Sequence, residues 1–316
     1  MTETLLILFA ALLLDRLLGE PRRAHPLAGF GRLATWLEGR LNPGARASAA
    51  GGRLRGLLAL ALLVLPPLGL LLALLVWPLN PALSLALNIA VLYFAIGGRS
   101  LAEHARRVRD ALREDDMARA RAATACLVSR DTAAMKRGDM LRATIESTLE
   151  NGSDALFAPL FWFLLAGAPG ALGYRLVNTL DAMWGYRTPR YRHFGWAAAR
   201  LDDVLNFVPA RLTALSYALA GRFGNALRCW FSQAGQCASP NAGPVMAAGA
   251  GALALQLGGP AVYHGRLRER PRLGRGAPPR GGDIDQALGL VRRSLALWLG
   301  VLILIQAAQI WGGGLA

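Results

Sequence analysis

Lysine is almost absent from this sequence: Lys136 is the only one, although Lys and Arg together number 35. Cysteine is also scarce, and the spacing of Cys126, Cys229 and Cys237 gives neither a CxxC pair nor a disulfide framework. The four scattered histidines form no HExxH motif, which argues against a dedicated zinc site. The sequence also lacks GxxxxGK followed by Ser or Thr, GxGxxG and GxSxG, so the usual P-loop, dinucleotide-binding and α/β-hydrolase motifs are excluded.

Apolar residues dominate: 54% of the chain is hydrophobic, 17% is charged and the mean hydropathy is +0.33. A helix needs about 20 apolar residues to cross the hydrocarbon of a bilayer. The clearest apolar runs are Leu5–Leu14, Leu57–Trp77, Pro81–Ile96 and Ser294–Trp311. The second and fourth runs are long enough, and the third is nearly so. We therefore predict an all-α integral membrane protein, one polytopic domain over residues 1–316, with about four to seven membrane helices.

Arginines account for nearly all of the formal charge of +15, and they crowd residues 22–55, 99–142, 187–211 and 266–293. Positive-inside bias places such segments in the cytoplasm, where they also attract anionic lipid. We expect residues 99–152 to form a polar helical segment on that side, and residues 266–282 to form a flexible basic loop. No stacking-aromatic motif accompanies the arginines, so nucleic acid is not an expected partner.

The apolar stretch Ala155–Ala166 is too short for a comfortable span and is followed by the helix-breaking sequence GAPG, residues 167–170. Polar clusters flank this stretch on both sides. Because a simple span would separate those clusters across the membrane, we favour a re-entrant hairpin here. Residues 204–220 and 242–257 raise the same choice between a span and a second re-entrant pair.

Carboxylate and amide side chains recur at helical spacing. Glu146 and Glu150 are four residues apart and share a helix face, and Asn178 and Asp181 do so three apart. Asp202 lies four residues before Asn206 and Asp203 three, so either aspartate can share a helix face with this asparagine. Such oxygens suit Mg²⁺, which takes one or two carboxylates and accepts other ligands from substrate phosphates. Structural roles stay open: Arg200 and Asp203 fit a plain ion pair, and Asn151 fits a helix end.

Six motifs in order resemble those of the CobD/CbiB family of cobalamin biosynthesis, from about Asp15 to Tyr263. They read DRLLGEP…HP, RDT, IESTLENGSDALFAPLFW, NTLDAMWGYR, FGWAAARLDDVLNFVPARL and SPNAGPVMAAGAGAL. The resemblance implies a multi-pass enzyme of the bacterial inner membrane whose active site faces the cytoplasm. It also implies an amide bond between adenosylcobyric acid and (R)-1-amino-2-propanol O-phosphate, or ethanolamine phosphate, with ATP as co-substrate and Mg²⁺. A homodimer, or a complex with other membrane enzymes of the pathway, stays open.

From the chemistry of that reaction we assign candidate roles. The candidate catalytic residues are Glu146, Asp181 and Asp203. The metal ligands and the base are expected among Glu146, Glu150, Asp181, Asp202 and Asp203. The candidates for binding the corrinoid and the aminoalcohol phosphate are Arg130, Asp131, Asn151, Asn178, Tyr186, Arg187, Arg200, Asn206, Arg211 and Asn241, with Asp15, Glu20 and His25 at the rim of the cavity.

Two other functions compete with this interpretation. An intramembrane prenyltransferase would bind Mg²⁺-diphosphate through Asp/Asn-rich motifs that NTLD and DDVLN resemble superficially. Its NDxxDxxxD spacing fails, because Thr179, Ala182 and Tyr186 occupy the positions that require aspartate. A transporter with broken helices around a midplane site is the other alternative, but the sequence shows no paired halves.

Overall fold

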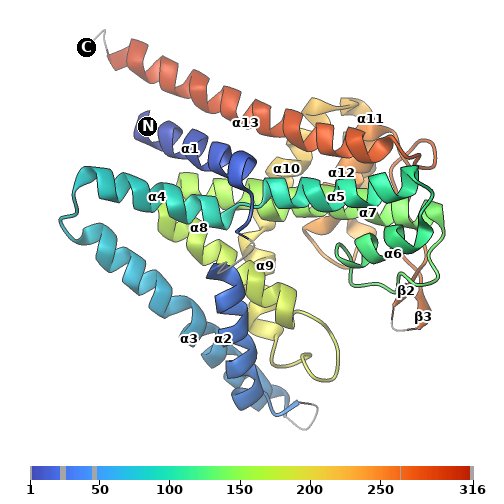
Figure 1. Ribbon diagram of the computed structural model, residues 1–316, viewed down its shortest axis with the longest axis horizontal. Coiled ribbons are helices and arrows are strands. Elements are labelled where there is room, and N and C mark those ends of the chain that lie inside the picture. The colour runs from blue at the N-terminus through green and yellow to red at the C-terminus, as the bar shows by residue number, and fades with distance from the viewer. Residues whose placement is uncertain (1, 22–25, 45–47, 264, 314–316) are drawn as a thin grey trace. The chain divides into compact units, whose positions relative to one another are not determined.

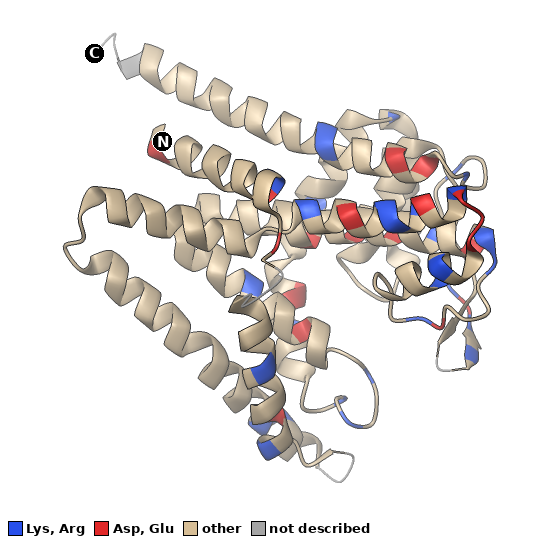
Figure 2. Cartoon of the chain, in the orientation of Figure 1, with Lys and Arg blue, Asp and Glu red and all other residues tan. Residues whose placement is uncertain are grey.

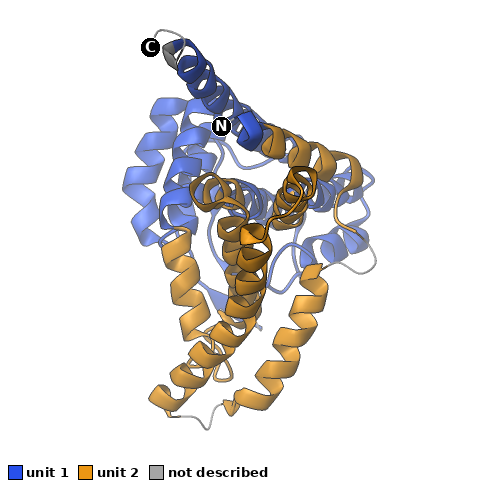
Figure 3. Ribbon diagram, turned by 90° about the vertical axis from the view of Figure 1, so that its left-hand side faces the viewer, with its two compact units in different colours: residues 1–5, 98–157, 207–316 blue, residues 6–97, 158–206 orange. Residues whose placement is uncertain are grey.

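The computed structural model describes residues 2–21, 26–44, 48–263 and 265–313 (Figure 1). The chain folds into two compact units, which Figure 3 colours separately. Unit 1 contains residues 1–5, 98–157 and 207–316, and unit 2 contains residues 6–97 and 158–206. Each unit therefore combines segments that lie far apart in the sequence.

The elements of the two units are as follows. Unit 2 contains most of α1 (Thr2–Leu18), with α2 (Pro26–Leu41), α3 (Ala49–Val76), α4 (Pro81–Ala95), α8 (Ala158–Trp184) and α9 (Trp196–Leu205). The helices of unit 1 are α5 (Gly98–Arg113), α6 (Met117–Ala125), α7 (Arg137–Gly152), α10 (Phe207–Ala220), α11 (Phe223–Gln233), α12 (Ala242–Leu253) and α13 (Asp283–Gly313). Unit 1 also has a π-helical turn (Ser153–Phe157), a 3₁₀ turn (Ala234–Gln236) and the strands β1 (Leu257–Gly258), β2 (Ala261–Tyr263), β3 (Arg266–Arg268) and β4 (Arg272–Leu273).

Four helical stretches in the described part of the chain are long and apolar enough to cross a membrane. They are Ala49–Val76, Pro81–Arg113, Arg137–Trp184 and Asp283–Trp311. Figure 2 shows that α4 and the C-terminal half of α13 carry no charged residues. The prediction of an all-α, multi-pass membrane protein is confirmed. Three of these stretches contain apolar runs that the sequence made evident, whereas α1 has only 17 residues and is not among them.

The predicted break at GAPG is present within α8. Ala166 and Gly167 leave helical geometry, and Gly167 has a φ of +62°, which favours glycine. A Cβ on Gly170 would lie 2.3 Å from the carbonyl oxygen of Trp162. Eight residues of straight helix rise about 12 Å, so the chain must bend sharply between these two positions. Both arms of α8 contact α9: before the bend the Trp162 indole N–H donates to the Leu205 carbonyl at 3.0 Å, and after it the Asn178 amide donates to Asp202.

The core of unit 2 joins α3, α8 and α9. Leu60, Leu63 and Leu180 are buried there, and the rings of Trp184 and Phe194 meet edge to face at a centroid separation of 5.0 Å. Aromatic pairs in this geometry add to the stabilisation that their burial provides. This packing fixes the end of α8 and the segment that leads into α9, and these two helices carry the aspartates described below.

A buried glutamate ties α2 to the loop before α9. Both carboxylate oxygens of Glu38 accept hydrogen bonds from Arg190, at 3.0 and 2.7 Å, and Asn42 donates a third at 2.7 Å. Burial alone would raise the pKa of Glu38, but these hydrogen bonds and the charge of Arg190 together lower it. The folded protein therefore favours the ionised carboxylate.

The Glu38→Gln variant should unfold at a lower temperature than the wild type at neutral pH, and the difference should vanish in acid. A lowered folded-state pKa stabilises the fold fully above the unfolded value, about 4.3, and that contribution is lost as the pH falls through the folded value. Thermal unfolding in detergent from pH 7 to pH 3 measures the difference. An offset that stays constant with pH would contradict this origin.

The polar segment 99–152 forms α5, α6 and α7 of unit 1. On α5 the apolar residues at helical spacing, Leu101, Ala105, Val108 and Leu112, are buried. Arg109 on the same helix bonds to Asp285 at the start of α13. This helix therefore packs within unit 1 by the amphipathic pattern that the sequence indicates.

The basic segment that was expected to be a loop contains short strands. β4 pairs antiparallel with β1, and β3 pairs antiparallel with β2. Gly258 in β1 has a φ of +73°, and a Cβ there would lie 2.0 Å from the carbonyl oxygen of Pro271. Glycine thus permits the close approach of the two strands, and the pairing brings residues 266–273 against the rest of unit 1.

Candidate functional site

Three aspartates and two asparagines gather in unit 2, and we call them the aspartate cluster: Asn178 and Asp181 on α8, with Asp202, Asp203 and Asn206 at the end of α9. Asp202 accepts a hydrogen bond at one oxygen from the Asn178 amide, at 3.1 Å, and at the other from the Asn206 amide, at 3.0 Å. The predicted helical spacing thus becomes a contact between two helices.

A buried tyrosine holds the aspartate cluster from behind. The Tyr174 hydroxyl donates to the Asn206 carbonyl oxygen at 2.9 Å, and both residues are buried. With one end of the Asn206 amide engaged by Tyr174, its NH₂ is directed at Asp202. Three residues in a chain therefore fix the orientation of the Asp202 carboxylate.

The aspartate cluster concentrates negative charge. Asp181 lies close enough to Asp202 and Asp203 for their charges to interact. Burial raises the pKa of the Asp202 carboxyl and the charge of Asp203 raises it further, although the hydrogen bonds from the asparagines oppose this shift. Arg200 pairs with Asp203 at 3.4 Å and is 60% exposed. A site of this composition attracts cations, and its raised pKa makes Asp202 easier to protonate than an exposed aspartate.

A second ionic centre lies in unit 1 around Glu146 on α7. One carboxylate oxygen accepts from Arg130 at 2.7 Å and from Arg270 at 2.9 Å, and the other accepts from the backbone N–H of Gly258 at 2.7 Å. The Glu146 side chain is only 2% exposed. These three hydrogen bonds leave the Glu146 carboxylate about one of its roughly four lone-pair positions for a cation or a proton.

Glu150 lies one turn after Glu146 and also interacts with the charges of Arg130 and Arg270. Cys237 is half-buried near the same groups, and burial raises the pKa of its thiol. A neutral thiol is a poor nucleophile, so this cysteine has the environment of a structural residue. The two glutamates face the two arginines, as their four-residue spacing predicted for a shared helix face.

The RDT segment is attached to the strands of unit 1. The backbone N–H of Asp131 donates to the Val262 carbonyl at 3.0 Å, and the Asp131 carboxylate accepts from the Gly265 N–H at 2.6 Å. On α7, the Asn151 amide donates to the Ser147 hydroxyl at 2.8 Å. Asp131 and Asn151 therefore make structural contacts beside the Glu146 centre.

Arg211 and Asn241 meet in unit 1. The Arg211 guanidinium donates to the Phe207 carbonyl at 2.7 Å and to the Asn241 side-chain oxygen at 3.3 Å. It also lies over the Phe207 ring, 3.5 Å from the centroid. These contacts join the start of α10 to the start of α12.

The remaining described candidates lie on α1 or in loops. Asp15 is buried on α1, Glu20 is exposed just after it, and Tyr186 and Arg187 are exposed in the loop after α8. His25 lies outside the described residues. Within the described ranges, no group of three His, Cys, Asp or Glu side chains is placed to hold a metal ion. A magnesium ion that shares substrate phosphates needs only one or two carboxylates, which Asp181 and Asp203 can supply.

Sequence reasoning missed three residues that complete the two centres: Arg270, Gly258 and Tyr174. Arg270 stands in an arginine-rich segment where nothing local distinguishes it from its neighbours. Tyr174 carried a readable signal, because it lies four residues before Asn178 on the same helix.

Comparison with known proteins gives a consistent result. The family described as CobD/Cbib protein matches residues 8–291. A cobalamin biosynthesis protein CobD of Stutzerimonas stutzeri is 56% identical over 300 residues, covering 94% of this chain and 96% of the relative. The protein of the same name from Chromobacterium violaceum is 56% identical, covering 93% and 94%, and that from Mycobacterium tuberculosis is 43% identical, covering 89% and 88%. No solved structure matches the chain significantly. This chain therefore belongs to the CobD/CbiB family of cobalamin biosynthesis proteins.

Proposed function

We propose that this chain joins the carboxylate of adenosylcobyric acid to the amine of (R)-1-amino-2-propanol O-phosphate, or of ethanolamine phosphate, to give adenosylcobinamide phosphate. We place the reaction at the cytoplasmic face of the bacterial inner membrane. Membership of the family places the chain in cobalamin biosynthesis. The structural observation that supports the proposal is the aspartate cluster. Its three carboxylates are half-buried, two amides hold that of Asp202, and together they have the composition that suits phosphate-bound magnesium.

A carboxylate at neutral pH is a poor electrophile and needs activation. In the proposed reaction a carboxylate oxygen of the corrinoid attacks the γ-phosphorus of ATP, and ADP leaves. The amine then attacks the acyl carbon, the C–N bond forms and inorganic phosphate leaves. Each turnover thus consumes one ATP and releases one proton from the amine.

The residues of unit 2 fit defined roles in this scheme. Mg²⁺ would neutralise the transferring phosphoryl group, and Asp181 and Asp203 would hold it. Asp202, whose pKa is raised, would accept the proton from the amine. Arg200 is exposed and only loosely paired with Asp203, so it can turn toward a phosphate.

Assay of the purified protein tests the proposal directly. The full chain in detergent would receive adenosylcobyric acid, (R)-1-amino-2-propanol O-phosphate, ATP and Mg²⁺. We expect mass spectrometry to detect adenosylcobinamide phosphate together with an equal amount of ADP. Parallel reactions without ATP, or with a non-hydrolysable ATP analogue, should give none. Product formed without ATP consumption would refute the activation step, and the absence of product with folded protein would refute the proposal.

A further inference from the structure

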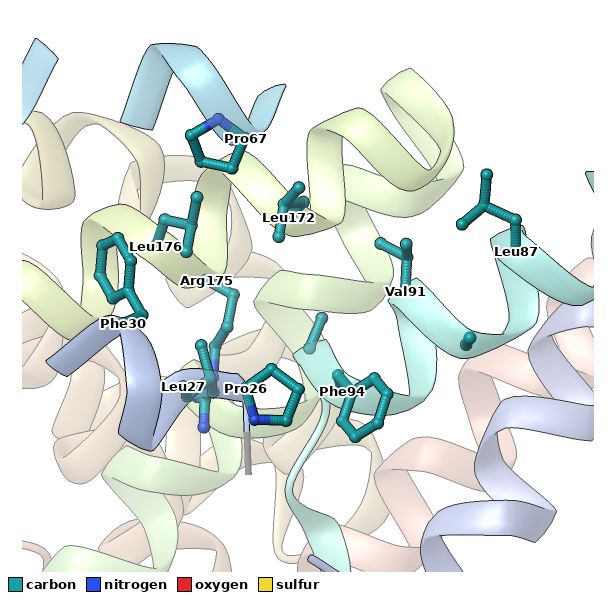
Figure 4. Close-up of a pocket in the computed structure, with 12 residues that line it drawn as sticks. Pro26, Leu27, Phe30, Pro67, Leu87, Val91, Phe94, Leu172, Arg175 and Leu176 are labelled. Atoms are coloured by element: carbon teal, nitrogen blue, oxygen red, sulfur yellow. The ribbon is translucent and has the colours of Figure 1, made fainter. Parts of the chain in front are cut away.

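Unit 2 contains an apolar cavity of about 400 Å³ that the chemistry above does not use (Figure 4). Residues of α2, α3, α4 and the second arm of α8 line it, among them Phe30, Pro67, Leu87 and Leu172. Its volume is at the small end of the range for ligand cavities, about 300–1,000 Å³. Such a cavity accepts one narrow apolar chain more readily than a bulky ring system.

One charged residue lines this cavity, Arg175 on α8. Its Nε atom is buried and has no hydrogen-bond partner among the described residues. A buried polar group without a partner costs free energy, and ionisable groups inside membrane-spanning helices are rarely retained without a use. The Nε–H of Arg175 therefore lacks an acceptor, which a ligand could supply.

The walls of the cavity are almost wholly apolar, and Arg175 is the one charged residue among them. Figure 4 shows Arg175 pointing from α8 toward Pro26 and Leu27 in the first turn of α2. Ala95, the last residue of α4, also lines the cavity, and charged sequence begins soon after it at Arg99. Leu87 and Pro67 lie within the apolar helices α4 and α3. The arginine thus marks the end nearer the membrane surface, and the apolar walls extend away from it.

We propose that this cavity binds one anionic phospholipid, with the lipid phosphate on Arg175 and part of one acyl chain against the apolar walls. The lipid oxygens provide the acceptor that Arg175 lacks, and a guanidinium binds phosphate oxygens with charge-assisted hydrogen bonds. The neighbouring membrane-spanning helices α3 and α4 expose leucines such as Leu65, Leu70 and Leu83. Two of the helices that line the cavity therefore present an apolar outer face to the bilayer.

Native mass spectrometry of the full chain in detergent tests the proposal. The protein would be titrated with phosphatidylglycerol and, separately, with phosphatidylcholine that has the same acyl chains. One bound phosphatidylglycerol, preferred about fivefold over phosphatidylcholine, is expected from one arginine near the membrane surface. Equal binding of the two lipids by the wild type would overturn the proposal.

Variants separate the two ends of the cavity. Arg175→Gln should remove the preference for phosphatidylglycerol, and Arg175→Lys should keep most of it. Ala90→Phe should weaken binding of phosphatidylglycerol by filling the apolar end, since Ala90 lines the cavity. The matched control is Arg32→Gln, which alters an exposed arginine on α2 of the same unit and should change nothing.

Further controls keep the test decisive. Thermal unfolding of each variant would establish that it folds. If Arg175→Gln does not fold, Ala90→Phe and Arg175→Lys still decide, because full binding by Ala90→Phe would overturn the proposal. Displacement of the lipid by excess inorganic phosphate would also overturn it, because it would identify a site for small anions rather than for lipid.

Discussion

Replacing Glu146 by alanine should lower the free energy of unfolding by about 3–5 kcal/mol. The change removes the shared partner of Arg130 and Arg270, whose side chains are only 10% and 20% exposed. It also removes the acceptor of the buried Gly258 N–H. Two guanidinium groups and one amide would then be buried without that acceptor, and breaking a buried ion pair from one side is among the most destabilising single changes.

Reversible unfolding in mixed detergent, followed by circular dichroism, would measure this loss. Arg270→Ala should cost less than Glu146→Ala, because Glu146 would keep Arg130 and the Gly258 N–H. The matched control is Glu103→Ala, which removes a glutamate that is 38% exposed and paired with Arg99, and should cost less than about 1 kcal/mol. If Glu146→Ala costs no more than this control, the Glu146 centre does not hold unit 1 together.

Local pattern predicted most of the helical architecture. The apolar runs at 81–96 and 294–311 lie within stretches long enough to span a membrane, and the run at 57–77 does so except for its last residue, Trp77. The break at Gly167 followed from a glycine and a proline whose backbone preferences oppose a continuous helix. These features depend on residues close in the chain, so the sequence suffices to place them.

The remaining long stretch, Arg137–Trp184, was not evident from the sequence because it starts with a polar segment. Glu146, Glu150 and Asp154 interrupt the apolar pattern between Arg137 and Ala155. In the structure α7, the π-helical turn and α8 follow one another directly, and most of α7 is buried. Ion pairing in unit 1 satisfies Glu146, so this part of the chain is helical despite its low local hydropathy.

The spacing of residues along the chain does not predict contacts between segments that are far apart in the sequence. Spacing predicted that Asp202 and Asn206 share a face, and they are hydrogen-bonded. It contained no information on the pairing of Arg270 with Glu146, which are 124 residues apart. Such ion pairs depend on how the helices and strands pack. From the sequence alone, many arginines of this chain are equally good partners for any one carboxylate.

Asp181→Asn and Asp203→Asn should each reduce the rate of adenosylcobinamide phosphate formation by about 10²–10³-fold, if the proposed function holds. Each substitution keeps the size of the side chain and removes one negative charge from the aspartate cluster. That charge is what would hold the divalent cation at the transferring phosphoryl group. The matched control is Asp115→Asn, which alters an aspartate whose side chain is 86% exposed in unit 1 and should leave the rate unchanged.

Dependence on magnesium distinguishes a role in cation binding from loss of structure. Both variants should need more Mg²⁺ for half-maximal rate, and excess Mg²⁺ should restore part of the activity, which it would not do for a misfolded protein. Because both carboxylates would act on one ion, the double variant should lose less than the product of the two single losses. Rates within threefold of wild type for both single variants, at limiting Mg²⁺, would remove the aspartate cluster from the catalytic site.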